Sequence, residues 1–166
     1  RVLSINGAPV GRELHNYYMM QPHEQYKADG SCMIIIATDA PLSSRNLERL
    51  AKRAYIAFGN VGGFSSNGSG DYAIAFSTSS AARVAHQTKR AEVWQTKDLY
   101  NDDLSPLFMA VWEATEEAIL NSMFAAEDMT GINGNTVKAL PINETLKILK
   151  KYNALNHADL PKAIAK

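Results

Sequence analysis

Residues 33–37 form an apolar run, and this run constrains the fold more than any other feature of the sequence. It reads Met-Ile-Ile-Ile-Ala, with turn-forming residues before it at 29–30 and after it at 39–41. Isoleucine is branched at Cβ and favours extended backbone, and an unbroken apolar run gives a strand two hydrophobic faces. We therefore predict a central strand that is buried on both faces. The run falls far short of the roughly 20 apolar residues of a membrane-spanning helix, so we expect no membrane association.

The apolar residues of 43–58 recur with the spacing of an amphipathic helix. Ser43 is suited to cap the first turn of this helix, and Gly59 is suited to end its last turn. The same period predicts a long helix over 104–123, which is the clearest in the chain, and a shorter one over about 143–153.

Side chains alternate in size over 71–78, which predicts a second strand. Its large residues share one face and are Tyr72, Ile74 and Phe76. Residues 1–30 read as loop and short extended pieces without a core of their own, and 79–103 read as irregular. The order strand, helix, strand, long helix, helix predicts an α/β layered fold.

The charge balance and the single cysteine exclude several classes of protein. Among the 166 residues, 17 Lys and Arg stand against 17 Asp and Glu, and no basic run occurs. This balance gives no electrostatic footprint for nucleic acid, which we do not expect as a partner. Cys32 is the only cysteine, so a disulfide scaffold is excluded.

The four histidines lack the sequence pattern of a metal site. They are His15, His23, His86 and His157. Neither the spacing of a helical zinc pair nor a neighbouring Cys or acidic cluster accompanies them. We interpret them as surface or hydrogen-bonded side chains, and we expect no metal and no cofactor. Phe108 and Trp112 on the predicted long helix are interpreted as core residues.

A glycine- and serine-rich segment over 62–70 precedes the second strand. It lacks the Lys and the following helix of a phosphate-binding loop, and the acidic Asp71 follows it directly. Ser69 and Asp71 lie two residues apart at the strand entrance, where the period of a strand places both side chains on one face. A hydroxyl beside a carboxylate can relay a proton. The alternative is that both residues only satisfy turns and caps.

The Gly30-Ser31 junction stands directly before the apolar strand. Attack of the Ser31 hydroxyl on the Gly30 carbonyl would form an ester, and hydrolysis of that ester would leave Ser31 as a new N-terminus. The freed α-amino group has an ordinary pKa of about 8, so it can act as a base for the neighbouring hydroxyl. Cleavage one residue later would make Cys32 the nucleophile, although a lone Cys at a strand start is more often a small buried hydrophobe. On spacing alone, a turn that leads into a strand is the better explanation of the junction.

Three blocks of sequence together carry a resemblance to a known family. They are Gly-Ser-Cys-Met-Ile-Ile-Ile-Ala-Thr-Asp-Ala-Pro-Leu over 30–42, Asn-Gly-Ser-Gly-Asp over 67–71 and Phe-Met-Ala-Val-Trp-Glu-Ala-Thr-Glu-Glu-Ala-Ile-Leu-Asn over 108–121. In this order they resemble the self-processing aminopeptidases of the L-aminopeptidase/D-Ala-esterase and β-peptidyl aminopeptidase family. Residues 2–14 also resemble the stretch before that family's cleavage site.

The resemblance implies an α/β fold, a four-layer αββα sandwich similar to that of N-terminal-nucleophile hydrolases but with different connectivity. Precursors of this family cut themselves before a Ser, which makes Gly30-Ser31 the implied autocleavage site and Ser31 the implied catalytic nucleophile. The resemblance makes Ser69 and Asp71 the groups that orient the nucleophile and relay its proton. Some members of the family carry Glu where this chain has Asp71.

By the same resemblance, residues 1–30 are the C-terminal tail of an α polypeptide and 31–166 are the whole β polypeptide. The family's oxyanion-hole Asn and its amine-binding acid would lie upstream of Arg1. The chain begins with Arg rather than Met and shows no targeting signal. We therefore expect upstream sequence that completes the αββα domain as a partner of this chain.

The leading hypothesis is a self-cleaving serine aminopeptidase or amidase, which hydrolyses N-terminal residues from short peptides, amides or esters through an acyl-enzyme on Ser31. One alternative is an acyltransferase of the ornithine-acetyltransferase-like fold, whose nucleophile is usually Thr. The other is a non-catalytic interaction subunit, in which Ser31 and Ser69 only close turns. From the resemblance we expect a homo-oligomer of αβ units in the cytoplasm, with the periplasm as the alternative compartment.

Overall fold

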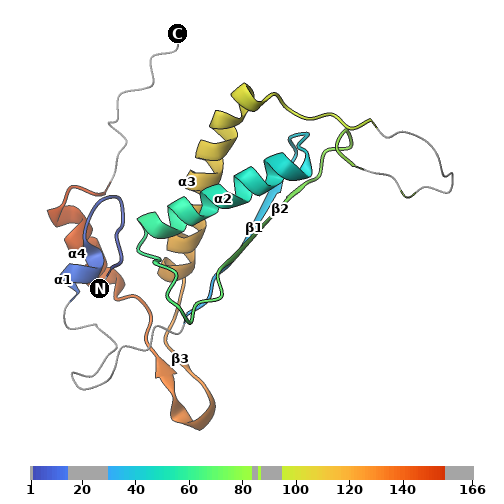
Figure 1. Ribbon diagram of the computed structural model, residues 1–166. Coiled ribbons are helices and arrows are strands. Elements are labelled where there is room, and N and C mark those ends of the chain that lie inside the picture. The colour runs from blue at the N-terminus through green and yellow to red at the C-terminus, as the bar shows by residue number, and fades with distance from the viewer. Residues whose placement is uncertain (1, 15–29, 84–85, 87–94, 156–166) are drawn as a thin grey trace. The chain divides into compact units, whose positions relative to one another are not determined.

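The computed structural model describes residues 2–14, 30–83, 86 and 95–155 (Figure 1). The chain divides into two compact units, of which the first comprises residues 1–26, 61–63 and 119–166, and the second comprises residues 27–60 and 64–118. Helix α3 (Ser105–Phe124) begins in the second unit and ends in the first. Its bounds agree with the predicted long helix to within one residue.

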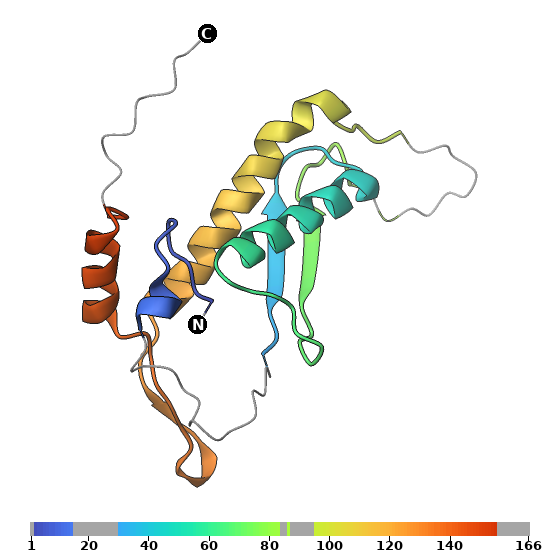
Figure 2. The same cartoon turned by 60° about the vertical axis from the view of Figure 1, so that its left-hand side comes forward.

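The second unit is built on two parallel strands, β1 (Met33–Thr38) and β2 (Tyr72–Ser77). Met33 pairs with Tyr72 and Thr38 with Ser77, so the strands run the same way in register. Parallel strands need a crossover connection, and α2 (Ser44–Asn60) provides it. Figure 2 shows the two strands side by side with α2 alongside them. Both predicted strands are therefore confirmed.

Helix α2 begins where the sequence predicts, but its end differs from the prediction. Ser43 Oγ accepts a hydrogen bond from the main-chain amide of Asn46 at 3.4 Å, which is the predicted N-terminal cap. The prediction that Gly59 ends the helix is wrong, because α2 continues to Asn60. The positive φ that glycine favours occurs instead at Gly62, where φ is 111° and any Cβ would collide with the main chain at Val2.

One face of the β1–β2 sheet packs against helices. Its side chains belong to a core with α2 and the first part of α3, whose buried members are Leu42, Leu50, Ala54, Leu104 and Val111. The strands contribute four partly buried residues to this core, and these are Ile34, Ile36, Ala73 and Ala75. The alternation of these inward residues with outward ones follows the strand period of two.

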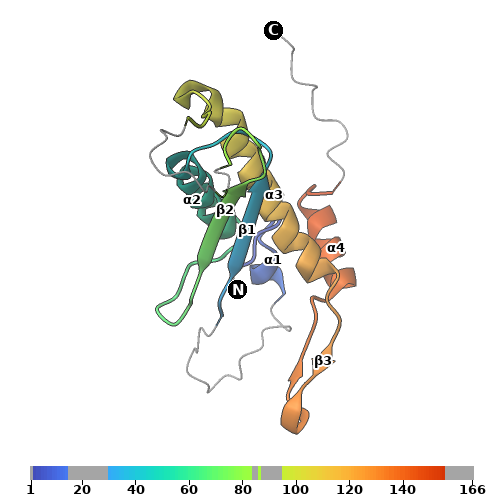
Figure 3. The ribbon, with the colours of Figure 1, turned by 90° about the vertical axis from the view of Figure 1, so that its right-hand side faces the viewer.

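The opposite face of the same sheet is apolar, and the helices of the second unit do not cover it (Figure 3). We call it the bare face; its large members are Met33, Ile35, Tyr72, Ile74 and Phe76, which are 44–66% exposed. The three large residues of β2 share one face, as predicted. The prediction that β1 is buried on both faces is wrong for this structure, because the described helices cover only one side.

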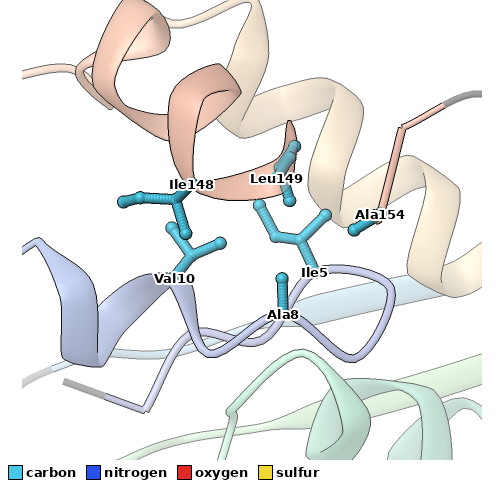
Figure 4. Close-up of a cluster of buried hydrophobic side chains, with 6 residues drawn as sticks. All are labelled: Ile5, Ala8, Val10, Ile148, Leu149 and Ala154. Carbon is cyan, nitrogen blue, oxygen red and sulfur yellow. The ribbon is translucent and has the colours of Figure 1, made fainter. Parts of the chain in front are cut away.

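The first unit contains a buried cluster between the N-terminal segment and α4 (Ile142–Lys151), which lies within the predicted helical range apart from its first residue. Figure 4 shows its side chains pointing toward one another, and they are Ile5, Ala8, Val10, Ile148, Leu149 and Ala154. The carboxylate of Glu13 also accepts hydrogen bonds from Lys151 Nζ and Tyr152 Oη, each at 2.8 Å. The N-terminal segment is therefore held to α4 by apolar and polar contacts.

Two expectations about irregular segments need correction. Residues 1–30 are not only loop and extended backbone, because α1 (Val10–Glu13) is a helical turn with Val10 fully buried. The segment between α3 and α4 holds the short hairpin of β3 (Met129–Thr130) and β4 (Thr136–Val137) around the 3-10 turn η3 (Ile132–Gly134). A second 3-10 turn, η2 (Asn101–Leu104), closes the stretch predicted to be irregular. Within the described stretches, no helix has the length and apolar character to cross a membrane.

Candidate active site

The register of β1 and β2 brings Ser31 and Gly70 to the same end of the sheet, because each lies two residues before its strand. The main-chain amide of Gly70 donates a hydrogen bond to Ser31 Oγ at 3.0 Å. A Cβ at position 70 would lie 3.4 Å both from Ser31 Oγ and from the ring of Tyr72. Such an atom would be in ordinary van der Waals contact with both groups, so the main chain at position 70 lies close to an exposed hydroxyl.

Ser69 Oγ stands between two acceptors at this sheet end. It contacts Asp71 Oδ2 at 2.8 Å and also makes a short contact with the carbonyl oxygen of Gly30. A hydroxyl carries one proton, so Ser69 donates to one of these acceptors at a time. No hydrogen bond joins Ser69 Oγ to Ser31 Oγ directly; main-chain atoms of Gly30 and Gly70 link the two residues.

Asp71 fixes the entrance of both strands. Its Oδ1 accepts a hydrogen bond from the main-chain amide of Cys32 at 2.9 Å. Three donors favour its ionised form, first the hydroxyl of Ser69 and then, more weakly, the hydroxyl of Ser65 and the amide of Cys32; they outweigh partial desolvation and hold the pKa of Asp71 below its ordinary value. Asp71 is therefore a carboxylate over the neutral pH range. The structure brings the predicted residues Ser31, Ser69 and Asp71 together at one end of the sheet. Their catalytic roles stay predictions.

Sequence reasoning missed two residues that contact Asp71. Tyr55 lies within the predicted amphipathic helix over 43–58, and its hydroxyl donates to the main-chain carbonyl oxygen of Asp71 at 2.8 Å. Ser65 has a left-handed backbone with φ of 47°, which is uncommon for a residue with a side chain. The Gly-Gly-Phe-Ser-Ser sequence around Ser65 signals a tight turn, but it does not signal which serine faces the carboxylate.

Cys32, the alternative nucleophile, has an environment that opposes thiolate formation. Partial burial, and then the negative charge of Asp71, raise the pKa of its thiol. The thiolate is the reactive form of cysteine, so this position is a poor place for a cysteine nucleophile. Its partly buried side chain agrees in part with the interpretation as a small buried hydrophobe.

The remaining candidates do not extend the site. His86 is exposed, and His15, His23 and His157 lie outside the described residues. In the described part of the chain, no three His, Cys, Asp or Glu side chains gather as a metal site would require. Phe108 is partly buried in the core as predicted, and the guanidinium groups of Arg49 and Arg53 lie 5.0 and 3.8 Å from its ring centroid.

Comparisons with known proteins give consistent results. Residues 1–137 match the model of peptidase family S58. The chain is 42% identical over 163 residues to the β-peptidyl aminopeptidase BapA of Sphingosinicella microcystinivorans. The match covers 92% of this chain and 40% of that protein.

Two solved structures are similar to the chain. One is the L-aminopeptidase D-Ala-esterase/amidase of Ochrobactrum anthropi, described as a prototype for the serine aminopeptidases and a variant of the Ntn hydrolase fold; the TM-score is 0.77 at 33% identity, over 93% of this chain and 40% of that one. The other is a β-aminopeptidase of Burkholderia sp., with a TM-score of 0.76 at 35% identity, over 90% of this chain and 40% of that one.

The similarity to these structures thus shows an α/β chain of the Ntn-hydrolase fold type. More particularly, the chain belongs to peptidase family S58. It spans about two fifths of the length of the relatives it matches.

Proposed function

We propose that this chain is the self-cleaving part of a serine aminopeptidase or amidase, which hydrolyses N-terminal residues from short peptides, amides or esters through an acyl-enzyme on Ser31. One observation carries the proposal: Ser69 donates to the carbonyl oxygen of Gly30, while the Gly70 amide donates to Ser31 Oγ. Both groups of the proposed scissile junction are thereby held by donors. The aminopeptidase names of the relatives support the same class.

Self-cleavage begins with attack of Ser31 Oγ on the carbonyl carbon of Gly30. The bond from carbon to Oγ forms, the bond from carbon to the Ser31 nitrogen breaks, and the hydroxyl proton passes to the departing amine. Water then hydrolyses the ester and leaves a Gly30 carboxylate. Negative charge develops on the Gly30 carbonyl oxygen during attack, so the Ser69 hydroxyl is placed to stabilise it.

Turnover uses the group that the cut creates. The α-amino group of Ser31 accepts the Oγ proton as Oγ attacks the carbonyl carbon of a substrate, because an amine of this kind has an ordinary pKa of about 8. The amine or alcohol of the substrate leaves with that proton, and water releases the acyl group from Oγ. Ser69 donates to the ionised Asp71, whose negative charge favours the protonated amine during the step.

The bare face supports a partner for this chain. Five large apolar side chains at 44–66% exposure form a patch of the kind that marks an interaction surface. We propose that the upstream α polypeptide of the same precursor covers this patch with a second sheet and completes the αββα sandwich. Assembly of such αβ units into a homo-oligomer is expected from the family resemblance alone.

Intact-mass measurement on the protein expressed from its complete coding sequence tests the proposal. Wild type and the matched control Cys32→Ala should be cut between Gly30 and Ser31, whereas Ser31→Ala should remain one chain. Cleavage at this bond in Ser31→Ala would overturn the mechanism.

Product analysis with an added amine acceptor separates the alternatives: free acid indicates hydrolysis, and acylated acceptor indicates an acyltransferase. A protein that is neither cut nor active would indicate the interaction subunit.

A further inference from the structure

We propose that Tyr55 is a positioning residue for the Asp71 carboxylate. The inference rests on the proposed function and adds to it a residue other than Ser31, Ser69 and Asp71. Tyr55 lies in the second half of α2, and its hydroxyl donates a hydrogen bond of 2.8 Å to the main-chain carbonyl oxygen of Asp71. The contact joins the helical layer to the strand entrance.

The carbonyl group of Asp71 and the amide N–H of Tyr72 belong to one peptide group, and the structure holds that group at both ends. The Tyr72 amide donates to the carbonyl oxygen of Cys32 at 2.8 Å, and the Tyr55 hydroxyl holds the carbonyl end. A peptide group is planar and rigid, so fixing both ends fixes its orientation. This peptide group is thus held on one side by Cys32, the residue before β1, and on the other by α2.

The side chain of Asp71 branches from the Cα atom next to this fixed peptide group. Its two carboxylate oxygens serve different donors, the Cys32 amide at 2.9 Å and the Ser69 hydroxyl at 2.8 Å. Both contacts need one orientation of the carboxylate, and that orientation depends on the main chain that carries it. Removing the Tyr55 hydroxyl would release the carbonyl end of the peptide group and lengthen these contacts. Tyr55 therefore acts through Asp71 and does not need to touch the substrate.

The substitution Tyr55→Phe removes only the hydroxyl and keeps the ring. The chain offers a matched control in Tyr152→Phe, because the Tyr152 hydroxyl also makes a 2.8 Å hydrogen bond, to Glu13 in the other compact unit. The exposure of the two residues is similar, 38% for Tyr55 and 42% for Tyr152. A general effect of losing a tyrosine hydroxyl would therefore appear in both variants.

We expect Tyr55→Phe to lower kcat for a small aminoacyl amide by about 3- to 30-fold, because small displacements of catalytic groups reduce rates strongly. KM should stay within about twofold of wild type, since ground-state binding does not use the Asp71 carboxylate. Tyr152→Phe should match wild type in both constants. In an Asp71→Asn background, Tyr55→Phe should cause no further loss, because its effect passes through the carboxylate.

Two results would overturn the inference: a kcat of Tyr55→Phe equal to that of Tyr152→Phe, or an undiminished effect of Tyr55→Phe in the Asp71→Asn background. A crystal structure of Tyr55→Phe tests the inference by distances around Asp71 and does not depend on enzyme activity. Longer distances from Asp71 to Ser69 Oγ and to the Cys32 amide support the inference, and unchanged distances contradict it. A wild-type protein without activity would count against the proposed function alone, because the crystallographic comparison still decides the role of Tyr55.

Discussion

The main-chain amide of Gly70 donates a 3.0 Å hydrogen bond to Ser31 Oγ, across 39 residues of sequence. Because Ser31 Oγ is the acceptor in this contact, its own proton stays free for transfer to a base. The same amide stabilises the negative charge that develops on Oγ as that proton leaves. The relationship depends on the parallel register of β1 and β2, which places two strand entrances side by side.

Substitution of the proposed relay residues should reduce turnover without unfolding the protein. Ser69→Ala and Asp71→Asn should each lower kcat by about 10²- to 10⁴-fold, the usual cost of losing a positioned proton-transfer group. Steady-state kinetics on the protein from its complete coding sequence gives the measurement. Ser122→Ala and Asp128→Asn, which lie in the other compact unit, are controls of matched chemistry. Normal turnover in both relay variants would return Ser69 and Asp71 to the role of turn and cap residues.

The bare face predicts how the 166-residue chain behaves when it is produced alone. We expect it to associate in solution and to be inactive, because its exposed apolar sheet surface lacks a covering layer. The double variant Ile35→Ser with Ile74→Ser should reduce this association, as measured by light scattering. Tyr100→Ser, at an isolated residue that is 84% exposed, should not. Co-expression with the upstream polypeptide should restore activity to wild type, and a monodisperse, active chain by itself would contradict the prediction.

Asp98 predicts a specific loss of stability in acid. Its carboxylate accepts hydrogen bonds from the Ser43 amide at 2.9 Å and from Asn46 Nδ2 at 3.0 and 2.9 Å. Desolvation alone would raise the pKa of Asp98. Hydrogen bonds from the Ser43 hydroxyl, from Asn46 and from the main-chain amides of Ser43 and Leu99 outweigh it and hold the pKa below the ordinary value of 3.8. A depressed pKa stabilises the fold above that ordinary value, and the contribution disappears as pH falls through the lower, folded-state pKa.

Asp98→Asn should therefore weaken the pH dependence of unfolding on the acid side of pH 3.8. Urea unfolding followed at a series of pH values measures this dependence. Asp102→Asn, at an exposed neighbouring carboxylate, is the control. An acid limb that is identical in the two variants would show that the contacts of Asp98 do not couple to folding.

The cluster around α4 predicts a contrast between two leucines of one helix. Leu149 is 3% exposed and packs in the buried cluster, whereas Leu146 is 39% exposed. Leu149→Ala should lower the free energy of unfolding by about 2–5 kcal/mol, the cost of a large-to-small change in a core. Leu146→Ala should cost less than about 1 kcal/mol. Denaturant titration measures both, and equal losses would show that α4 is not held through this cluster.

The periodicity of the sequence predicted the helices and strands that bury one face within the described chain. The alternation around Ile74 and the helical spacing around Val111 gave β2 and α3 nearly to the residue, because each pattern records one buried face. The same method failed for β1. An apolar run such as Ile34-Ile35-Ile36 shows that both faces need cover, but not whether the described chain supplies it.

The candidate site was only partly predictable. The predicted placement of Ser69 and Asp71 on one side agrees with their contact of 2.8 Å, although both residues precede β2. The contacts of Tyr55 and Ser65 depend on how α2 lies over the sheet and on one left-handed residue in a loop. Neither feature has a period, and a tyrosine at helical spacing looks like any other core residue.

The hydrogen bond from the Cys32 amide to Asp71 has a consequence for a chain end that a cut at Gly30-Ser31 would create. Cys32 is the residue next to the new terminus, and consecutive Cα atoms are only about 3.8 Å apart. The freed amine would therefore stay within one residue's length of the carboxylate that anchors its neighbour. Two groups tethered so closely meet at a very high effective molarity, of the order that intramolecular reactions reach. The ionised carboxylate would therefore favour the protonated form of this amine at every turnover.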